Sequence, residues 1–264
     1  MRTPDSFRLQ GAPNFRDFGG YETQCGKKLV SGKLYRSDAL DKLSEEDQQL
    51  LVESGLATII DLRGTHERAS QPHKLSAESR SEILSFPIHG DLRTNDTSVL
   101  QKIAENPTAE GCYDAMIFAY GEIIERMAEH LPDIFEILLN ESSYPVLVHC
   151  TAGKDRTGFL CALIHHALNI PEESIYHDYF LTQTYCPPEL YQLSLIENLE
   201  QKIGVSVAEE DLLPLKMINE DYLRHAFKVV ENKYGSIDNY LEEVAGLDSE
   251  KRARLFELLI DSSD

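Results

Sequence analysis

One cysteine and one arginine in the middle of the chain have the spacing of a phosphate-binding nucleophile site. They lie in residues 149–158, which read HCTAGKDRTG and are here called the phosphate loop; five residues separate Cys150 from Arg156. An apolar run precedes the loop and a helical pattern follows it, which predicts a strand, a tight turn and a helix. Backbone N–H groups at such a helix start bind anions, and the helix dipole adds about half a positive charge. This field favours a thiolate at Cys150, aimed at a bound phosphate.

The other positions of the phosphate loop suit the same chemistry. The guanidinium of Arg156 is a planar fork that can bind two phosphate oxygens as the phosphoryl group flattens. The hydroxyl of Thr157 can donate to the Cys150 sulfur. Gly153 and Gly158 permit close approaches that a side chain would obstruct. The residues that we expect to bind phosphate are Thr151, Ala152, Gly153, Lys154, Asp155, Arg156 and Thr157.

Short apolar runs alternate with helical stretches along the first two thirds of the chain. Residues 57–63, 82–88 and 145–148 have the apolar character of strands, while residues 44–55 and 110–139 have helical patterns. Strands separated by helices pair in parallel, with helices on both faces of the sheet. The sequence therefore predicts an α/β fold with a central, largely parallel sheet. Residues beyond 170 are predicted to be helical.

Ligands of such a fold gather where the parallel strands end. This rule places Asp61, Arg63 and Asp91 on the same rim as the phosphate loop, because they lie at or just beyond the ends of predicted strands. We expect Asp61 and Arg63 to support the loop together with Gly158. His149 precedes the nucleophile and can order the loop by hydrogen bonding.

The phosphate loop resembles the signature of the protein tyrosine phosphatases, H-C-x-x-G-x-x-R-[ST]-G, at every fixed position. With residues 14–21 (NFRDFGGY) and 34–37 (LYRS), it is similar to the bacterial-type tyrosine phosphatase family, which includes secreted virulence phosphatases. Weaker matches follow in order at residues 60–63, 178–182 and 234–241. The resemblance implies one phosphatase domain over residues 1–264.

Two further expectations come from this resemblance. Residues 185–217 are expected to form a helical lid over the site; an ordinary packing extension is the alternative, because an amphipathic helix pair has the same pattern in both cases. A salt-bridge network that braces the site is expected at the family-pattern positions. These positions are Arg16, Asp17, Arg36 and Arg63.

The resemblance also implies a two-step reaction, in which Cys150 forms a phosphocysteine that water then hydrolyses. The chain has no tryptophan, unlike the loop that carries the acid in the large tyrosine phosphatases. Asp155 occupies the position that this family uses for the general acid, whereas Asp91 corresponds to the acid of dual-specificity phosphatases. Lys154 is expected to bind an additional phosphate, as in lipid-directed relatives, or to pair with Asp61, and both can hold in different states.

Composition limits the partners and the compartment. A net charge of −20 argues against nucleic-acid binding, and most of the excess acid lies after residue 170. No apolar stretch approaches the ~20 residues of a membrane span, so no integral membrane association is expected. Five cysteines without metal-ligand spacing, and no signal-peptide pattern, predict a cytoplasmic protein without metal or cofactor. Secretion by a route without a signal peptide stays open.

Several functions use such a loop. The first is hydrolysis of phosphotyrosine, and also phosphoserine or phosphothreonine, in phosphorylated proteins. The second is hydrolysis of phosphoinositides or inositol phosphates, with a phospholipid substrate; Lys154 favours it, but Thr151 stands where a second basic residue would be. A noncatalytic phosphoresidue-binding module would not need both Cys150 and Arg156. A thiol oxidoreductase or sulfurtransferase explains Arg156 and Thr157 less well.

Overall fold

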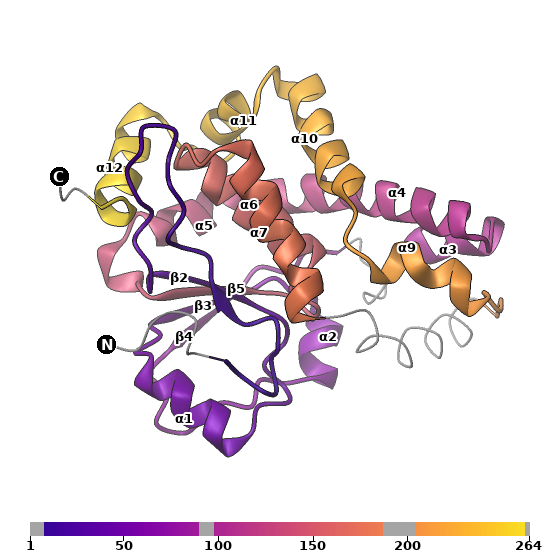
Figure 1. The fold of residues 1–264 in the computed structure, drawn as a ribbon, viewed down its shortest axis with the longest axis horizontal. Helices are drawn as coiled ribbons and strands as arrows, with labels where there is room; N and C mark the ends of the chain where they lie inside the picture. Colours follow the sequence, from indigo (N-terminus) through magenta and orange to yellow (C-terminus); the bar gives the residue numbers. More distant parts are fainter. Residues whose placement is uncertain (1–7, 90–97, 187–203, 262–264) are drawn as a thin grey trace.

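A mixed sheet of five strands lies at the centre of the molecule (Figure 1). A computed structural model of the chain describes residues 8–89, 98–186 and 204–261. The strand order is β1-β2-β5-β3-β4; β1 is antiparallel to β2, and the other neighbours are parallel. The strands are β1 (Arg16–Asp17), β2 (Leu34–Ser37), β3 (Thr58–Asp61), β4 (Glu82–Ser85) and β5 (Val146–His149). The predicted, largely parallel sheet is confirmed.

The register brings the ends of the parallel strands to one edge. His149 at the end of β5 pairs with Ser37 on one side and with Asp61 on the other. Asp61 in turn pairs with Ser85 at the end of β4. The segments that follow these four residues therefore leave the sheet side by side, and the phosphate loop leaves from its middle strand.

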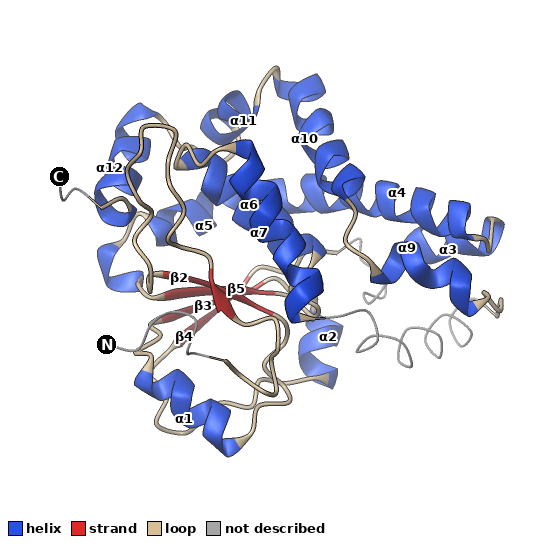
Figure 2. Cartoon of the chain, in the orientation of Figure 1, coloured by secondary structure: helices blue, strands red, loops and turns tan. Residues whose placement is uncertain are grey.

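Helices cover both faces of this sheet (Figure 2). Helix α1 lies against one face, and α4, α5 and α6 belong to the larger group on the other. The helices of the described residues are α1 (Glu45–Glu53), α2 (Thr65–Ser70), α3 (Ser98–Glu105), α4 (Ala109–Ala128), α5 (Leu131–Leu138), α6 (Asp155–Ala167), α7 (Glu172–Tyr185), α9 (Leu213–Lys216), α10 (Glu220–Tyr234), α11 (Ile237–Glu243) and α12 (Ser249–Leu259), with 3-10 turns η2 (Glu141–Ser143) and η4 (Glu209–Leu212).

Alternating side chains of the central strands build two cores. Ile59 of β3 and Leu147 of β5 belong to the smaller core beside α1. Their neighbours Ile60, Val146 and Val148 belong to the larger core on the opposite face. Successive side chains of a strand point to opposite faces, so an apolar run buries both faces at once. This is why the strands before the site have continuous apolar sequences.

Local sequence signals explain where several elements begin and end. Ser44 caps α1 by accepting the Asp47 N–H, and Asp47 accepts the Ser44 N–H in return. In the structure β4 is shorter than the predicted strand over residues 82–88, although the N–H groups of Phe86 and Ile88 still donate to the carbonyls of Asp61 and Leu62. The helix expected from Phe159 begins at Asp155 instead, so the second half of the phosphate loop is the first turn of α6.

The predicted lid, residues 185–217, lies only partly within the described chain. Residues 187–203 fall outside it. The described part contains η4 and α9, where Leu212 and Leu215 are buried. The backbone oxygen of Leu215 accepts a hydrogen bond of 2.8 Å from Nζ of Lys154. This part therefore packs next to the phosphate loop, and lid motion stays a prediction.

The described helices include none with the length and apolar character that crossing a membrane requires.

Candidate active site

Outward-facing carbonyls give the phosphate loop its shape. The Thr151 carbonyl accepts the Ala39 N–H at 3.0 Å. Nδ2 of Asn14 donates to the carbonyls of Ala152 and Gly153, both at 3.0 Å. Nη2 of Arg36 also donates to Gly153 O, at 2.9 Å. In a trans peptide the N–H points opposite to the preceding C=O, so the N–H groups of residues 152–154 face the interior of the loop.

Two glycines are required by this arrangement. Gly153 has a φ of 65°, and a Cβ there would lie 2.3 Å from Ser37 O. A Cβ at Gly158 would lie 2.9 Å from a ring carbon of Tyr179. The first glycine lets the loop turn against β2, and the second lets α7 pack against the start of α6. The sequence prediction of close approach at both positions is confirmed.

Cys150 lies at the bottom of the loop, directly after β5. Its side chain is buried, and Sγ accepts the Gly153 N–H at 3.3 Å. The start of α6 lies within the same loop. Both the amide and the helix dipole stabilise negative charge on the sulfur. The geometry therefore suits a thiolate nucleophile.

Thr157 does not make the predicted hydrogen bond to this sulfur. Its hydroxyl is buried without a hydrogen-bond partner among the described residues. The prediction is wrong because Thr157 belongs to the first turn of α6, while the Gly153 N–H approaches the sulfur from the loop.

Arg156 is fixed by a carboxylate that sequence reasoning missed. Nη1 and Nη2 donate to the two oxygens of Glu67, each at 2.8 Å. Glu67 also accepts the Gly64 N–H at 2.8 Å and the hydroxyl of Thr151. Burial alone would raise the pKa of Glu67, but Arg156 and these donors lower it well below its usual range. The only sequence signal was its place in the segment after β3.

Asp61 and His149 anchor the other side of the loop. His149 Nδ1 donates to Cys150 O at 2.9 Å, and its Nε2 lies 2.9 Å from Nε2 of His73. Asp61 accepts the Arg63 backbone N–H at 2.9 Å and the Arg63 side chain at 3.0 Å. His149 thus contacts the loop directly, and the supporting role of Asp61 and Arg63 stays a prediction. The predicted pairing of Lys154 with Asp61 is wrong, since Nζ of Lys154 lies 3.6 Å from Asp155.

Ligand-type side chains do cluster, contrary to the sequence expectation. Atoms of Asp61, His73 and His149 lie within 4.8 Å of one another. However, Nη2 of Arg63 donates to Asp61 at 2.9 Å and contacts Nε2 of His73 at 3.1 Å. A metal ion would have to share these ligands with a fixed positive charge. The cluster is therefore better suited to an ion pair than to a metal ion.

A buried ion triad links the N-terminal segment to α7. Asp178 accepts hydrogen bonds from Nε of Arg16, at 3.3 Å, and from Nη1 of Arg36. Nη2 of the same Arg36 donates to Gly153 O. Burial alone would raise the pKa of Asp178, but the two guanidinium groups lower it to about 2. The expected bracing network is confirmed for Arg16 and Arg36. Asp17 lies apart from it and accepts the N–H groups of Gly19 and Gly32.

The two candidate acids differ in what the structure shows. Asp155 is buried at the start of α6, and its Oδ1 accepts the hydroxyl of Tyr120 at 2.9 Å. The Tyr120 hydroxyl also contacts the Tyr179 hydroxyl at 2.6 Å. Asp91 lies outside the described residues. Asp155 is therefore the candidate whose surroundings can be analysed.

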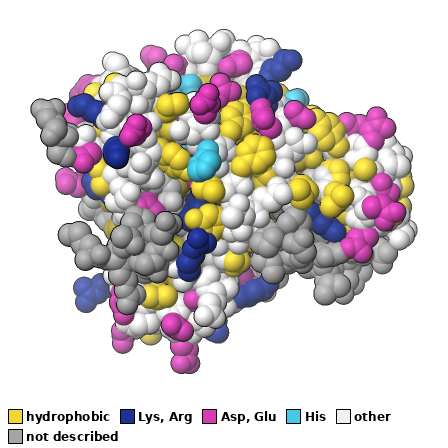
Figure 3. All heavy atoms as spheres, in the orientation of Figure 1, with side chains coloured by type: hydrophobic (Ala, Val, Ile, Leu, Met, Phe, Trp, Pro, Cys, Tyr) yellow, Lys and Arg dark blue, Asp and Glu magenta, His cyan; other side chains and the backbone are white. Residues whose placement is uncertain are grey.

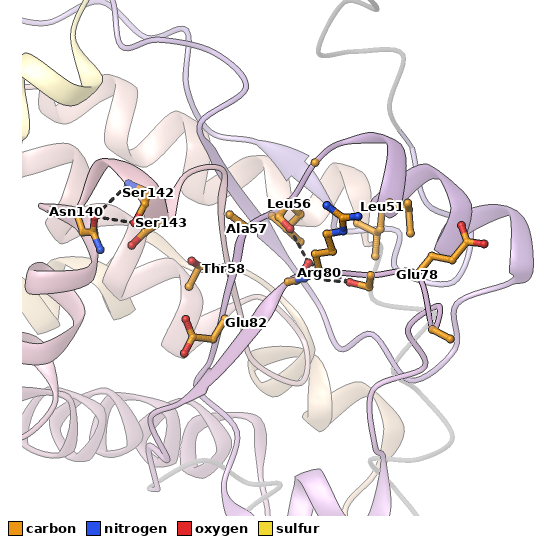
Figure 4. A pocket seen from close by; sticks show the side chains of 15 residues that line it. Leu51, Leu56, Ala57, Thr58, Glu78, Arg80, Glu82, Asn140, Ser142 and Ser143 are labelled. Atoms are coloured by element: carbon orange, nitrogen blue, oxygen red, sulfur yellow. Dashed lines mark hydrogen bonds between the residues drawn. The ribbon is translucent and has the colours of Figure 1, made fainter.

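A polar hollow lies at the far end of the sheet (Figure 4). It is lined by Thr58 and Glu82, the first residues of β3 and β4, and by Arg80 and Asn140. Parallel strands that begin at this hollow end at the phosphate loop. No residue of the phosphate loop lines it, so the hollow is separate from the candidate active site.

Charge on the surface is spread unevenly (Figure 3). Acidic side chains lie mainly toward the outer edges of the face shown, and several basic ones lie nearer its middle. Salt screens exposed charges over about 8 Å at physiological ionic strength. The excess acid of the outer helices therefore has little influence on a phosphate held by buried donors.

The sequence of this chain is similar to those of several known proteins. The sequence model of the tyrosine phosphatase family matches residues 7–261. A Cupriavidus necator protein, whose provisional name is tyrosine-protein phosphatase, is 27% identical over 89% of this chain and 82% of its own length. The triple specificity protein phosphatase PtpB of Mycobacterium tuberculosis is also 27% identical, over 89% of this chain and 92% of PtpB.

A solved structure is also similar over much of its length. It is the core catalytic domain of the PP-IP phosphatase SIW14 from S. cerevisiae, which aligns with 79% of this chain and 90% of its own, at 17% identity and a TM-score of 0.35.

Proposed function

The chain belongs to the tyrosine phosphatase family, and we propose that it hydrolyses phosphotyrosine in proteins through a phosphocysteine on Cys150. One observation carries this proposal: the Cys150 sulfur, the inward N–H groups and Arg156 converge at the start of α6. These are the nucleophile, the oxyanion donors and the guanidinium that phosphoryl transfer requires. The enzyme is a phosphatase, and no metal is needed for this mechanism.

In the first step, the Cys150 thiolate attacks phosphorus, the S–P bond forms and the P–O bond to the tyrosine breaks. The inward N–H groups and the guanidinium of Arg156 hold the three other phosphate oxygens as they flatten into one plane. Glu67 fixes the Nη1–Nη2 edge of Arg156, and we expect the Nε–Nη2 edge to meet the phosphate. The leaving phenolate takes a proton from the general acid.

In the second step, water attacks phosphorus, the S–P bond breaks and the thiolate of Cys150 leaves. The same carboxylate accepts the proton of this water, which restores the acid. We propose that Asp155 has this role, because it lies in the phosphate loop and its carboxylate is held by a hydroxyl donor. If Asp91 has the role instead, the Asp155→Asn enzyme will keep its normal rate.

The substrate range depends on Lys154. Its amine donates to Leu215 O and lies beside Asp155, so a second phosphate would have to draw it from a buried carbonyl. These contacts favour protein substrates over phosphoinositides. We include phosphoserine and phosphothreonine in the proposed range. Cys25, Cys112, Cys150 and Cys161 are free thiols, and a catalytic thiol is preserved by reduction, so we propose a cytoplasmic setting.

The test is hydrolysis of p-nitrophenyl phosphate and of phosphotyrosine, phosphoserine and phosphothreonine peptides. We expect Cys150→Ser to lose at least ~1000-fold in kcat, as nucleophile variants do. Cys25→Ser is the matched control, because this exposed thiol lies outside the phosphate loop. The rate is expected to be the same in EDTA. Normal hydrolysis by Cys150→Ser, or activity on inositol lipids alone, would contradict the proposal.

A further inference from the structure

Two buried tyrosines form a chain of hydroxyl groups that ends on Asp155. Tyr120 comes from α4 and Tyr179 from α7, and both side chains are almost completely buried. Their hydroxyl oxygens are 2.6 Å apart, and the Tyr120 hydroxyl is 2.9 Å from Oδ1 of Asp155. Three side chains from three helices therefore meet within hydrogen-bond distance beneath the phosphate loop.

The direction of this chain follows from counting protons. A carboxylate oxygen can only accept, so the single hydroxyl proton of Tyr120 is donated to Asp155. The Tyr179 hydroxyl must then donate to the Tyr120 oxygen. Burial raises the pKa of both tyrosines well above the usual range, so both keep their protons at any working pH. The order is Tyr179 to Tyr120 to Asp155.

We propose that Tyr120 is a positioning residue that holds Asp155 in the orientation required of a general acid, and that Tyr179 orients Tyr120. This inference rests on the proposed role of Asp155. Because the Tyr120 hydroxyl occupies Oδ1, the proton that Asp155 transfers is carried by Oδ2. The carboxyl group is thus prevented from rotating between its two oxygens.

The packing around this chain supports a positioning role. Tyr179 follows Asp178, whose ion pairs with Arg16 and Arg36 fix this turn of α7. Its ring also lies where a Cβ at Gly158 would clash, at 2.9 Å. The glycine of the phosphate loop therefore makes room for the tyrosine that completes the chain.

Other charged groups around Asp155 act differently. Nζ of Lys154 lies 3.6 Å from Oδ2 of Asp155. Arg36 and Tyr222 also interact electrostatically with members of this cluster, from β2 and α10. Tyr120, in contrast, donates a direct hydrogen bond to Oδ1 of Asp155. Removing its hydroxyl is therefore the most direct perturbation of the carboxyl orientation.

The experiment compares Tyr120→Phe with the wild type on aryl phosphates of differing leaving-group acidity. Loss of acid alignment affects poor leaving groups most, so we expect kcat/KM to fall ~10-fold on phenyl phosphate, and much less on p-nitrophenyl phosphate. The loss should appear in kcat and leave KM near the wild-type value, because Tyr120 is fully buried and its hydroxyl binds Asp155. Tyr179→Phe should lower kcat on phenyl phosphate in the same way, by less.

Two further variants separate this inference from the proposed function. Tyr240→Phe removes a buried hydroxyl from α11, away from the site, and should match the wild type in both readouts. In an Asp155→Asn background, Tyr120→Phe should cause no further change. A normal Asp155→Asn rate would disprove the proposed acid. If Asp155→Asn is slow but Tyr120→Phe and Tyr179→Phe both keep the wild-type kcat and the wild-type leaving-group dependence, the positioning role is overturned.

Discussion

Glu67 contacts Arg156 through two parallel hydrogen bonds of 2.8 Å, one from each carboxylate oxygen to a separate guanidinium nitrogen. Both side chains are buried, and Glu67 comes from α2, outside the phosphate loop. Such a fork-to-fork pair fixes the plane of the guanidinium. The plane in which Arg156 meets a phosphate is therefore set by a neighbouring helix.

Glu67→Gln should loosen the orientation of the Arg156 guanidinium without removing it. An amide can accept only one of the two hydrogen bonds, and a buried arginine then lacks part of its counter-charge. We expect kcat/KM on p-nitrophenyl phosphate to fall by roughly 10- to 100-fold, as for loss of one charged hydrogen bond of about 1.5–3 kcal/mol. Glu46→Gln, on the exposed face of α1, is the control. Equal rates for both variants would show that Arg156 needs no such support.

Gly153→Ala should lower the free energy of unfolding by more than the cost of its positive φ alone. An L residue at φ 65° costs roughly 1–2 kcal/mol, and here the new Cβ would also lie 2.3 Å from Ser37 O. Gly55→Ala isolates the first effect, because Gly55 has a φ of 67° and open space around it. Urea unfolding should show a larger loss for Gly153→Ala, together with loss of activity. Equal losses would mean that the loop moves away from Ser37.

The sequence predicted the parts of the site that are contiguous along the chain. The strand, turn and helix around Cys150 have strong local signals, because apolar runs, glycines and an anion-binding helix start occur within ten residues of each other. The partners that shape this loop come from far away: Asn14 binds its carbonyls, Glu67 fixes Arg156, and Tyr120 holds Asp155. Residue spacing does not determine such contacts, since they depend on how helices pack.

The same limit explains the two residue pairings that were wrong. Lys154 and Thr157 were expected to find partners within the rim of the sheet. Lys154 instead donates to a carbonyl of α9, and Thr157 lies within the first turn of α6. In both cases the position was predicted correctly, but the direction of the side chain depends on elements that the sequence does not place.

Asp178→Asn should reduce stability in a pH-dependent way. The native pKa of Asp178 is about 2, below the ordinary 3.8, so the carboxylate contributes stability above pH 4 that is lost as pH falls toward 2. A shift of this size corresponds to roughly 2 kcal/mol. The variant should therefore be much less stable than the wild type at pH 7, and the difference should narrow by pH 3 in urea unfolding. Asp114→Asn, on an exposed turn of α4, should show no such narrowing.

His73→Gln should change acid stability over a different and higher range. Burial and the neighbouring His149 lower the pKa of His73 to about 4, whereas an unfolded histidine has a pKa near 6.5. The unfolded chain therefore binds a proton before the native protein does, and the wild type loses stability as pH falls from 6.5 to 4, by about 3 kcal/mol from this group. A glutamine cannot titrate, so the variant should have a shallower slope of unfolding free energy over this range. His66→Gln is the control, because that histidine is exposed on the surface of α2. An unchanged slope in His73→Gln would mean that the imidazole is already protonated in the native state, shared with His149 and neutralised by Asp61.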